Sequence, residues 1–275
     1  MAMHHTPTQY VSTAHGKIAV QTKGNGLPLL FLHGNSACRR VFDKQFHSPL
    51  FDGYQLISFD LPGHGESDDA SEPDNSYVLP GLASLALELL DQLRVTRAVL
   101  FGASLGGHIA IEMLARSTVP AGLFLVGTPP VGQSMAEGFI GRPLNGLASQ
   151  AQLSTEEAQY FARAVFGAGY EPFMQQAIAR TDAAFRPALF EGARRGLGAN
   201  QRDIVSLKPV PIAIANGAND GIVNLDYIDS VPYANLWRGQ CARIPGATHS
   251  PFWEVPDQFN ALLAGFMADF AAMPG

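Results

Sequence analysis

Continuous apolar runs of five or six residues alternate with longer amphipathic segments along most of the chain. Such runs are typical of strands covered on both faces, and their spacing predicts βαβ crossovers in a parallel sheet. A hairpin at residues 10–14 and 17–21, split by His15 and Gly16, is expected to add an antiparallel edge. The other predicted strands are residues 28–32, 55–59, 98–102, 121–126, 211–215 and 240–244.

Amphipathic segments between these runs predict the covering helices. In residues 77–93, Leu82, Leu85 and Leu89 recur on one side at helical spacing. A closing helix is expected at residues 256–271. Pro256 suits its first turn, because the backbone N–H groups there make no hydrogen bond within the helix and the N–H that proline lacks is not missed. This order predicts an α/β protein with a mostly parallel, eight-stranded sheet and helices on both faces.

The alternation stops at residues 131–207, where no good strand pattern occurs. Helical candidates replace it at residues 155–166, with Ser154 as the N-cap, and at residues 172–180 and 183–195. We therefore expect a core domain formed by residues 1–130 and 208–275, with residues 131–207 inserted as a helical cap over the sheet.

The composition is that of an ordered globular protein. Of 275 residues, 47% are apolar and 15% are charged, so the chain can bury a large core. The net charge of −6 comes from scattered acids, and no run of lysine or arginine forms a basic stripe. Nucleic acids and membranes are therefore not expected partners.

Cysteine content and the N-terminal segment limit the cellular context. Cys38 and Cys241 are too few for a disulfide framework or a zinc cage, and both are expected to be buried thiols. No apolar segment is long enough to span a bilayer, and residues 1–7 lack the apolar core of a signal peptide. A cytoplasmic location is expected.

The candidate chemistry centres on Gly102-Ala103-Ser104-Leu105-Gly106, between a predicted strand and a helical run. Gly-x-Ser-x-Gly in this context is typical of a nucleophile elbow, a strained turn that lifts the serine hydroxyl clear of the sheet. The glycines allow the backbone to fold that tightly. Ser104 is therefore the candidate nucleophile.

A serine hydroxyl needs a general base and a group that orients the base. Asp220 and His249 each follow a predicted strand. Together with Ser104 they give the chain order serine, acid, histidine, which is typical of proteins with a nucleophile elbow. The carboxyl ends of parallel strands are where sites on open α/β sheets form. The rival acids Asp226 and Asp229 fall in a predicted helix after the loop that holds Asp220, and they are interpreted as surface charges.

Donors for a developing oxyanion are expected on two backbone segments. The N–H of Leu105 follows the nucleophile directly, and the turn after the strand at 28–32 supplies the N–H of Asn35. The Asn35 side chain is open to two interpretations, a further donor or a residue that only shapes the turn. His108, on the helix after the elbow, is interpreted as a packing residue.

These motifs together resemble the α/β-hydrolase superfamily over nearly the whole chain. They are His-Gly-Asn from residue 33, Asp-Leu-Pro-Gly-His-Gly-Glu-Ser from residue 60, Gly-x-Ser-x-Gly-Gly-His from residue 102, and then Asp220 and His249. Five segments look similar to the metal-independent N-acyl-homoserine lactonases of this fold, which quench quorum sensing. They are residues 33–36, 127–131, 179–182, 200–205 and 235–237.

The resemblance implies an α/β-hydrolase fold and hydrolytic opening of a homoserine lactone ring through an acyl-enzyme on Ser104, with no metal or other cofactor. The implied partner is a small-molecule ester or lactone with an apolar acyl chain. Expected substrate contacts from the core are Gly34 and Ala103, and those from the cap are Phe139, Tyr160, Phe161, Phe166 and Phe185. Ala103 stands where the family has a bulky aromatic, and Tyr160 is shifted by one from the expected register.

Other functions use the same motifs. A general carboxylesterase or an enol-lactone or carbon–carbon bond hydrolase would use the same triad, and an acylase would cleave the amide of the same substrate. A non-catalytic ligand receptor on this scaffold could also retain these residues. The sequence leaves open whether the chain is a monomer or a homodimer.

Overall fold

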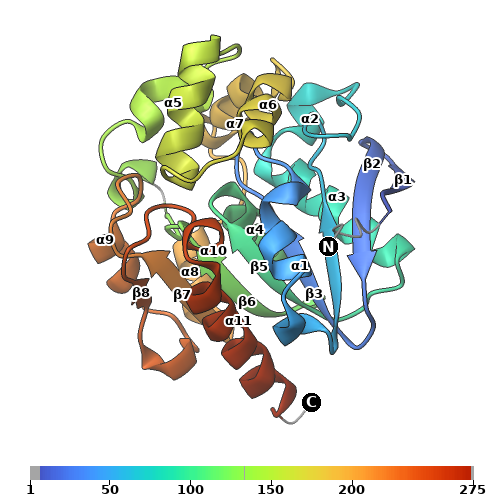
Figure 1. Ribbon diagram of the computed structural model, residues 1–275, viewed down its shortest axis with the longest axis vertical. Coiled ribbons are helices and arrows are strands. Elements are labelled where there is room, and N and C mark those ends of the chain that lie inside the picture. Colours follow the sequence, from blue (N-terminus) through green and yellow to red (C-terminus); the bar gives the residue numbers. More distant parts are fainter. Residues whose placement is uncertain (1–6, 133, 274–275) are drawn as a thin grey trace.

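The computed structural model describes residues 7–132 and 134–273, whose strands form one sheet in the order β1-β2-β4-β3-β5-β6-β7-β8 (Figure 1). β1 and β2 pair antiparallel, as do β2 and β4, and the remaining neighbours are parallel. The predicted mostly parallel sheet is confirmed. The strands are β1 (Gln9–Thr13), β2 (Gly16–Lys23), β3 (Leu27–Leu32), β4 (Tyr54–Phe59), β5 (Ala98–Ala103), β6 (Pro120–Val126), β7 (Ile212–Gly217) and β8 (Ala242–Ile244).

The helices lie between and around these strands, and most follow the predicted boundaries. The predicted helix at 77–93 begins two residues later, because Val78 has an extended backbone with ψ 155°. The longer helices are α3 (Leu79–Gln92), α4 (Leu105–Arg116), α5 (Thr155–Phe166), α6 (Pro172–Arg180), α7 (Phe185–Arg194), α8 (Gln201–Leu207) and α11 (Pro256–Ala271). The short ones are η1 (Arg39–Phe42), α1 (Asp43–Phe46), η2 (Pro49–Phe51), α2 (Pro73–Ser76), η3 (Met135–Gly138), η4 (Pro143–Ser149), α9 (Leu225–Asp229), η5 (Trp237–Gly239) and α10 (Pro251–Glu254).

Each inner strand divides its side chains between the two faces of the sheet, as the period of two requires. Leu30 and Leu100 belong to the apolar cluster under α3 and α4, whereas their neighbours Phe31 and Phe101 belong to the cluster under α11. All four side chains are fully buried. The continuous apolar runs therefore reflect burial on both faces.

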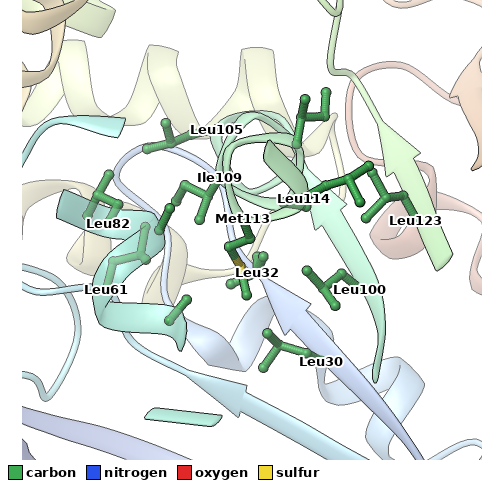
Figure 2. Packing of buried hydrophobic residues seen from close by; sticks show 14 of the residues in the cluster. Leu30, Leu32, Leu61, Leu82, Leu100, Leu105, Ile109, Met113, Leu114 and Leu123 are labelled. Atoms are coloured by element: carbon green, nitrogen blue, oxygen red, sulfur yellow. The ribbon is translucent and has the colours of Figure 1, made fainter. Parts of the chain in front are cut away.

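The cluster under α4 supports the turn that follows β5. Figure 2 shows Ile109 and Met113 of α4 on the side of the helix that faces Leu32 of the sheet, and Leu105 at the start of the helix belongs to the same apolar cluster. Burial of a leucine side chain of this kind stabilises a fold by about 1.5–3 kcal/mol. The start of α4 is thus fixed by packing along one whole side of the helix.

The segment between β6 and β7 contains only helices among its described residues, and α5, α6 and α7 lie together beyond one end of the sheet (Figure 1). Ser154 caps α5, since its hydroxyl accepts the N–H of Glu157 while the Glu157 carboxylate accepts the N–H of Ser154. The predicted helix at 183–195 is shorter, and α8 was not predicted. The division into a core and a cap domain stays our interpretation of this arrangement.

The helices and the two cysteines can be compared with the expectations from composition. No helix among the described residues has the length and apolarity needed to cross a bilayer. Cys38 is buried as expected, but Cys241 is partly exposed, because it precedes the edge strand β8, and both are free thiols.

Leu100→Ala is predicted to lower the free energy of unfolding by about 2–5 kcal/mol, because Leu100 is fully buried and its truncation leaves a cavity under α4. Leu207 at the end of α8 is 76% exposed, so Leu207→Ala should change that free energy by less than about 0.5 kcal/mol. Urea unfolding followed by circular dichroism measures both variants. Equal losses in the two would contradict the assignment of the core.

Candidate active site

Ser104 lies in a strained turn between β5 and α4, with φ 53° and ψ −118°. Two close backbone approaches hold this turn. A Cβ on Gly102 would lie 2.4 Å from the Cα of Gly107, and a Cβ on Gly106 would lie 1.9 Å from the carbonyl oxygen of Leu32. Only glycine fits at either position, so the Gly-x-Ser-x-Gly pattern has the geometric cause that the sequence predicted.

His249 and Asp220 form a buried pair at the ends of neighbouring strands. His249 follows β8, Asp220 follows β7, and the Nδ1–H of His249 donates to Asp220 Oδ2 at 2.7 Å. The other carboxylate oxygen accepts the N–H groups of Ile222 (2.8 Å) and Val223 (3.2 Å). Both side chains of the pair are almost fully buried. The carboxylate is therefore fixed in place, and the bond leaves Nε2 of His249 free of the proton.

Each member of the pair favours the charged form of the other. Burial opposes the charged form of His249, but the charge and hydrogen bond of Asp220, with the charge of Glu254 behind them, outweigh burial and raise the pKa of His249. Burial likewise acts to raise the pKa of Asp220, but His249 and the two N–H groups outweigh it and lower that pKa. An imidazolium formed during a reaction would thus be stabilised here.

The loop that carries His249 is held by Glu254 of α10. Its carboxylate accepts the backbone N–H of Thr248 at 3.0 Å and that of Ser250 at 3.1 Å, one on either side of His249. Gly127 approaches the ring from the other side, where a Cβ would lie 2.6 Å from His249 Cε1. Sequence reasoning missed Glu254, because no local pattern marks the carboxylate as a partner of its own loop.

Ser104 and His249 line the same cavity. Within the part of the chain that the structure describes, Ser104 Oγ makes no hydrogen bond to the imidazole. Contacts of this kind often tighten only when the reacting group is bound. The rival acids lie at the surface, where Arg243 pairs with Asp226 at 2.8 Å and with Asp229 at 2.7 Å.

The backbone N–H groups of Asn35 and Leu105 donate to no protein acceptor among the described residues. The Asn35 side chain has a structural contact, since its Nδ2 donates to the carbonyl oxygen of Ala148 in η4 at 2.9 Å. Its Oδ1 accepts the hydroxyl of Ser36 at 2.9 Å. The side chain therefore joins the turn to the helical segment above it.

Arg186 of α7 reinforces this junction from a buried position. Its Nε donates to Ser36 Oγ at 2.8 Å, and its NH2 nitrogen donates to the carbonyl oxygen of Ile178 at 2.7 Å. No carboxylate pairs with it among the described residues, and burial lowers the pKa of Arg186 to about 10. Sequence reasoning did not find this residue, since its partners are distant in the chain.

Two buried histidines hold the loops on the other side of the turn. His33 Nε2 accepts the N–H of Leu61 at 3.0 Å, and His64 Nε2 accepts the N–H of Ser36 at 3.1 Å. The rings lie 5.2 Å apart between centroids. Both histidines therefore hold backbone segments near the site in place.

A cavity of about 410 Å³ opens beside Ser104, between the sheet and the helices of the 131–207 segment. Five of the residues expected to contact substrate line it: Gly34, Ala103, Phe139, Phe161 and Phe166. Apolar side chains that sequence reasoning did not single out complete much of the wall, among them Leu79, Leu144, Val165, Leu189, Ile222 and Phe252. No local signal marks these residues, because they meet only when the helices pack over the sheet.

Tyr160 and Phe185, also expected to contact substrate, lie outside the cavity lining. Tyr160 is 48% exposed, and its hydroxyl accepts the Asn145 side chain at 2.9 Å. One step along α5 turns the side-chain direction by about 100°, so Phe161 faces inward and Tyr160 outward. Phe185 packs its ring against His64, 4.2 Å between centroids, beneath the cavity wall.

Comparisons with known proteins agree with this arrangement. Bacillus subtilis AB hydrolase superfamily protein YisY is 25% identical over 94% of this chain and 98% of its own length. The structure of a serine-to-glycine variant of N-acyl homoserine lactonase AidH, complexed with N-hexanoyl homoserine lactone, is 40% identical with a TM-score of 0.95, over 98% of this chain and 100% of that chain. An esterase from Exiguobacterium antarcticum shares the fold, with 22% identity and a TM-score of 0.76 over 94% of this chain and 99% of its own.

The family comparison covers most of both the sheet and the helices packed on it. The model of the alpha/beta hydrolase family matches residues 29–262, a range that holds the elbow at Ser104 as well as Asp220 and His249. The chain belongs to the alpha/beta hydrolase family.

Proposed function

We propose that this protein is a serine hydrolase that opens the lactone ring of N-acyl homoserine lactones. The observation that carries the proposal is the joint placement of Ser104, the His249–Asp220 pair and two free backbone N–H groups at one end of an apolar cavity. Such a set can attack a carbonyl carbon, accept the displaced proton and stabilise the resulting oxyanion.

The first half of the proposed reaction forms an acyl-enzyme. Ser104 Oγ attacks the ring carbonyl carbon while Nε2 of His249 takes the hydroxyl proton, and Asp220 stabilises the imidazolium. The N–H groups of Asn35 and Leu105 donate to the carbonyl oxygen as it becomes negative. The ring C–O bond then breaks, and His249 returns the proton to the alkoxide, which stays tethered to the acyl group.

The second half releases the product. Water gives a proton to Nε2 of His249 and attacks the acyl carbon. The second tetrahedral intermediate then collapses, and His249 returns the proton to Ser104 Oγ as the bond to the acyl carbon breaks. The product is an N-acyl homoserine, one water heavier than the lactone. Such a product no longer contains the ring, so the proposed activity would quench signalling by these lactones.

Similarity to AidH supports this substrate class over other esters. The AidH serine variant is complexed with the closed N-hexanoyl homoserine lactone, and AidH itself with the open N-butanoyl homoserine, both at 40% identity to this chain. The esterase neighbour at 22% identity carries information on the fold alone. The cavity wall of leucine, valine and phenylalanine side chains suits an apolar acyl chain.

Ser104→Ala is predicted to lower kcat for lactone opening by about 10⁴- to 10⁶-fold, because the nucleophile is lost while the fold is kept. The measurement is product mass by chromatography and mass spectrometry after incubation with short- and long-chain N-acyl homoserine lactones. Spontaneous ring opening is subtracted with a sample lacking enzyme.

Three outcomes of this incubation are informative. A Ser104-dependent gain of one water, reversed when acid closes the ring, supports lactone opening. Release of the free fatty acid identifies an acylase instead. Survival of all the lactones while an aryl ester is cleaved in a Ser104-dependent way would contradict the proposed substrate and support a general carboxylesterase.

The base is predicted to titrate above the ordinary imidazole pKa of about 6.5, because Asp220 raises the pKa of His249. A general base acts in its neutral form, so kcat/KM should rise with pH through that raised pKa. Asp220→Asn removes the charge but keeps the burial, which should move the titration of the His249 ring to lower pH. NMR of the imidazole carbon–proton signals measures the midpoint in each protein.

Asp226→Asn is the matched control, since the Asp226 side chain is 93% exposed and pairs with Arg243 at the surface. It should leave both the His249 midpoint and the lactone-opening rate close to those of the unmodified protein, whereas Asp220→Asn should lower kcat on the order of 10⁴-fold. A larger loss in Asp226→Asn than in Asp220→Asn would refute the assignment of the acid.

A further inference from the structure

His108 lies one helical turn after Ser104 on α4, and its backbone N–H donates to the carbonyl oxygen of Ser104 at 3.3 Å. Side chains on a helix lean back toward its N-terminus, so the His108 ring leans toward the turn that holds Ser104. The ring also lines the cavity, 6.3 Å from the ring of Phe139 between centroids. His108 therefore faces the same space as the candidate nucleophile, which a purely packing role does not require.

Two hydrogen bonds to Gln201 of α8 fix the tautomer of this ring. The Gln201 Nε2 amide donates to the backbone carbonyl oxygen of His108 at 3.1 Å, which sets the direction of the side-chain amide. Gln201 Oε1 then lies 2.6 Å from His108 Nδ1 and can only accept. The ring proton is therefore on Nδ1, and Nε2 presents a lone pair.

Burial keeps the ring in this neutral form. Burial outweighs the hydrogen bond to Gln201 and lowers the pKa of His108 below its ordinary value. Within the described residues, Nε2 has no protein hydrogen-bond partner, yet it is not among the fully buried polar atoms that lack one, so it is partly accessible. The accessible part of Nε2 is thus an unused acceptor on a mostly apolar wall.

We propose that His108 Nε2 accepts the amide N–H of the substrate. This inference rests on the proposed lactone-opening function. An N-acyl homoserine lactone with an unsubstituted chain has one hydrogen-bond donor, the amide N–H, and it lies on the carbon next to the ring carbonyl that Ser104 would attack. An acceptor one turn from Ser104 satisfies this donor inside the cavity, while Asn35 and Leu105 donate to the carbonyl oxygen.

The consequence is a preference for amide-linked over ester-linked acyl groups on the lactone ring. A substrate that brings an N–H into the apolar cavity without a partner loses the hydrogen bond it made with water, which weakens its binding about 10-fold. An ester-linked analogue has no such donor and incurs no such cost. Discrimination by His108 should therefore appear as a ratio between the two linkages.

The test compares N-hexanoyl homoserine lactone with α-hexanoyloxy-γ-butyrolactone, which carries an ester oxygen in place of the N–H. His108→Leu should lower kcat/KM for the amide substrate about 10-fold more than for the ester-linked one. His108→Gln should recover part of this ratio, because its amide can donate to Gln201 and present an oxygen to the cavity. Loss of packing at α8 would lower both rates together and leave the ratio unchanged.

The outcomes separate this inference from the proposed function. If the unmodified protein opens neither lactone, the proposed function is wrong. If it opens both and His108→Leu leaves their kcat/KM ratio unchanged, the role of His108 is overturned while lactone opening stands.

A second measurement covers the case in which the variants do not fold. The unmodified protein should favour the amide substrate over the ester-linked one by about 10-fold more than hydroxide ion does in solution, because only the protein offers an acceptor to the N–H. Equal preferences of protein and hydroxide would refute the role of His108. Circular dichroism and thermal unfolding establish which variants are folded.

Discussion

Backbone segments of β3, β5 and α4 approach one another around Ser104 with no side chain between them, and the rest of the site depends on this close approach. Gly102 at the end of β5 lies against Gly107 of α4, and Gly106 lies against the Leu32 carbonyl of β3. These contacts hold Ser104 at a positive φ that a non-glycine residue rarely adopts. The packing of α4 on the sheet maintains the strain and places Leu105 at the wall of the cavity.

Buried polar groups join the helical segment to the turn at Asn35. Arg186 binds Ser36, Ser36 donates to Asn35, and Asn35 donates to Ala148 of η4. This chain of hydrogen bonds runs from the cavity roof to the backbone that we propose as an oxyanion donor. A buried cation held by carbonyl oxygens and a hydroxyl group is costly to uncouple, because each freed partner would remain buried. Docking of the helices and shape of the turn are therefore linked.

Local patterns predicted the parts of the structure that local forces determine. Ser154 and Glu157 fix the start of α5, and the Gly-x-Ser-x-Gly spacing fixes the elbow at Ser104. The ends of the neighbouring strands β7 and β8 also bring Asp220 next to His249, with 2.7 Å between Oδ2 and Nδ1. In each case the residues that decide the geometry are neighbours in sequence or end adjacent strands of a regular sheet.

Contacts between distant segments could not be predicted in the same way. Arg186 binds Ser36 across 150 positions, and Gln201 fixes the tautomer of His108 across 93. The choice between Tyr160 and Phe161 as the inward residue depends on how α5 is rotated against the sheet, which a resemblance of motifs does not specify. Side-chain roles in the cavity therefore required the three-dimensional arrangement.

Rapid quenching of the reaction, followed by mass analysis of the Ser104 peptide, tests the central claim most directly. Because the alkoxide of an opened ring stays attached to the acyl group, we predict an adduct on Ser104 with the full mass of the lactone. An adduct that contains only the fatty acyl chain would show amide cleavage. A substrate-derived adduct on another residue, with none on Ser104, would contradict the account.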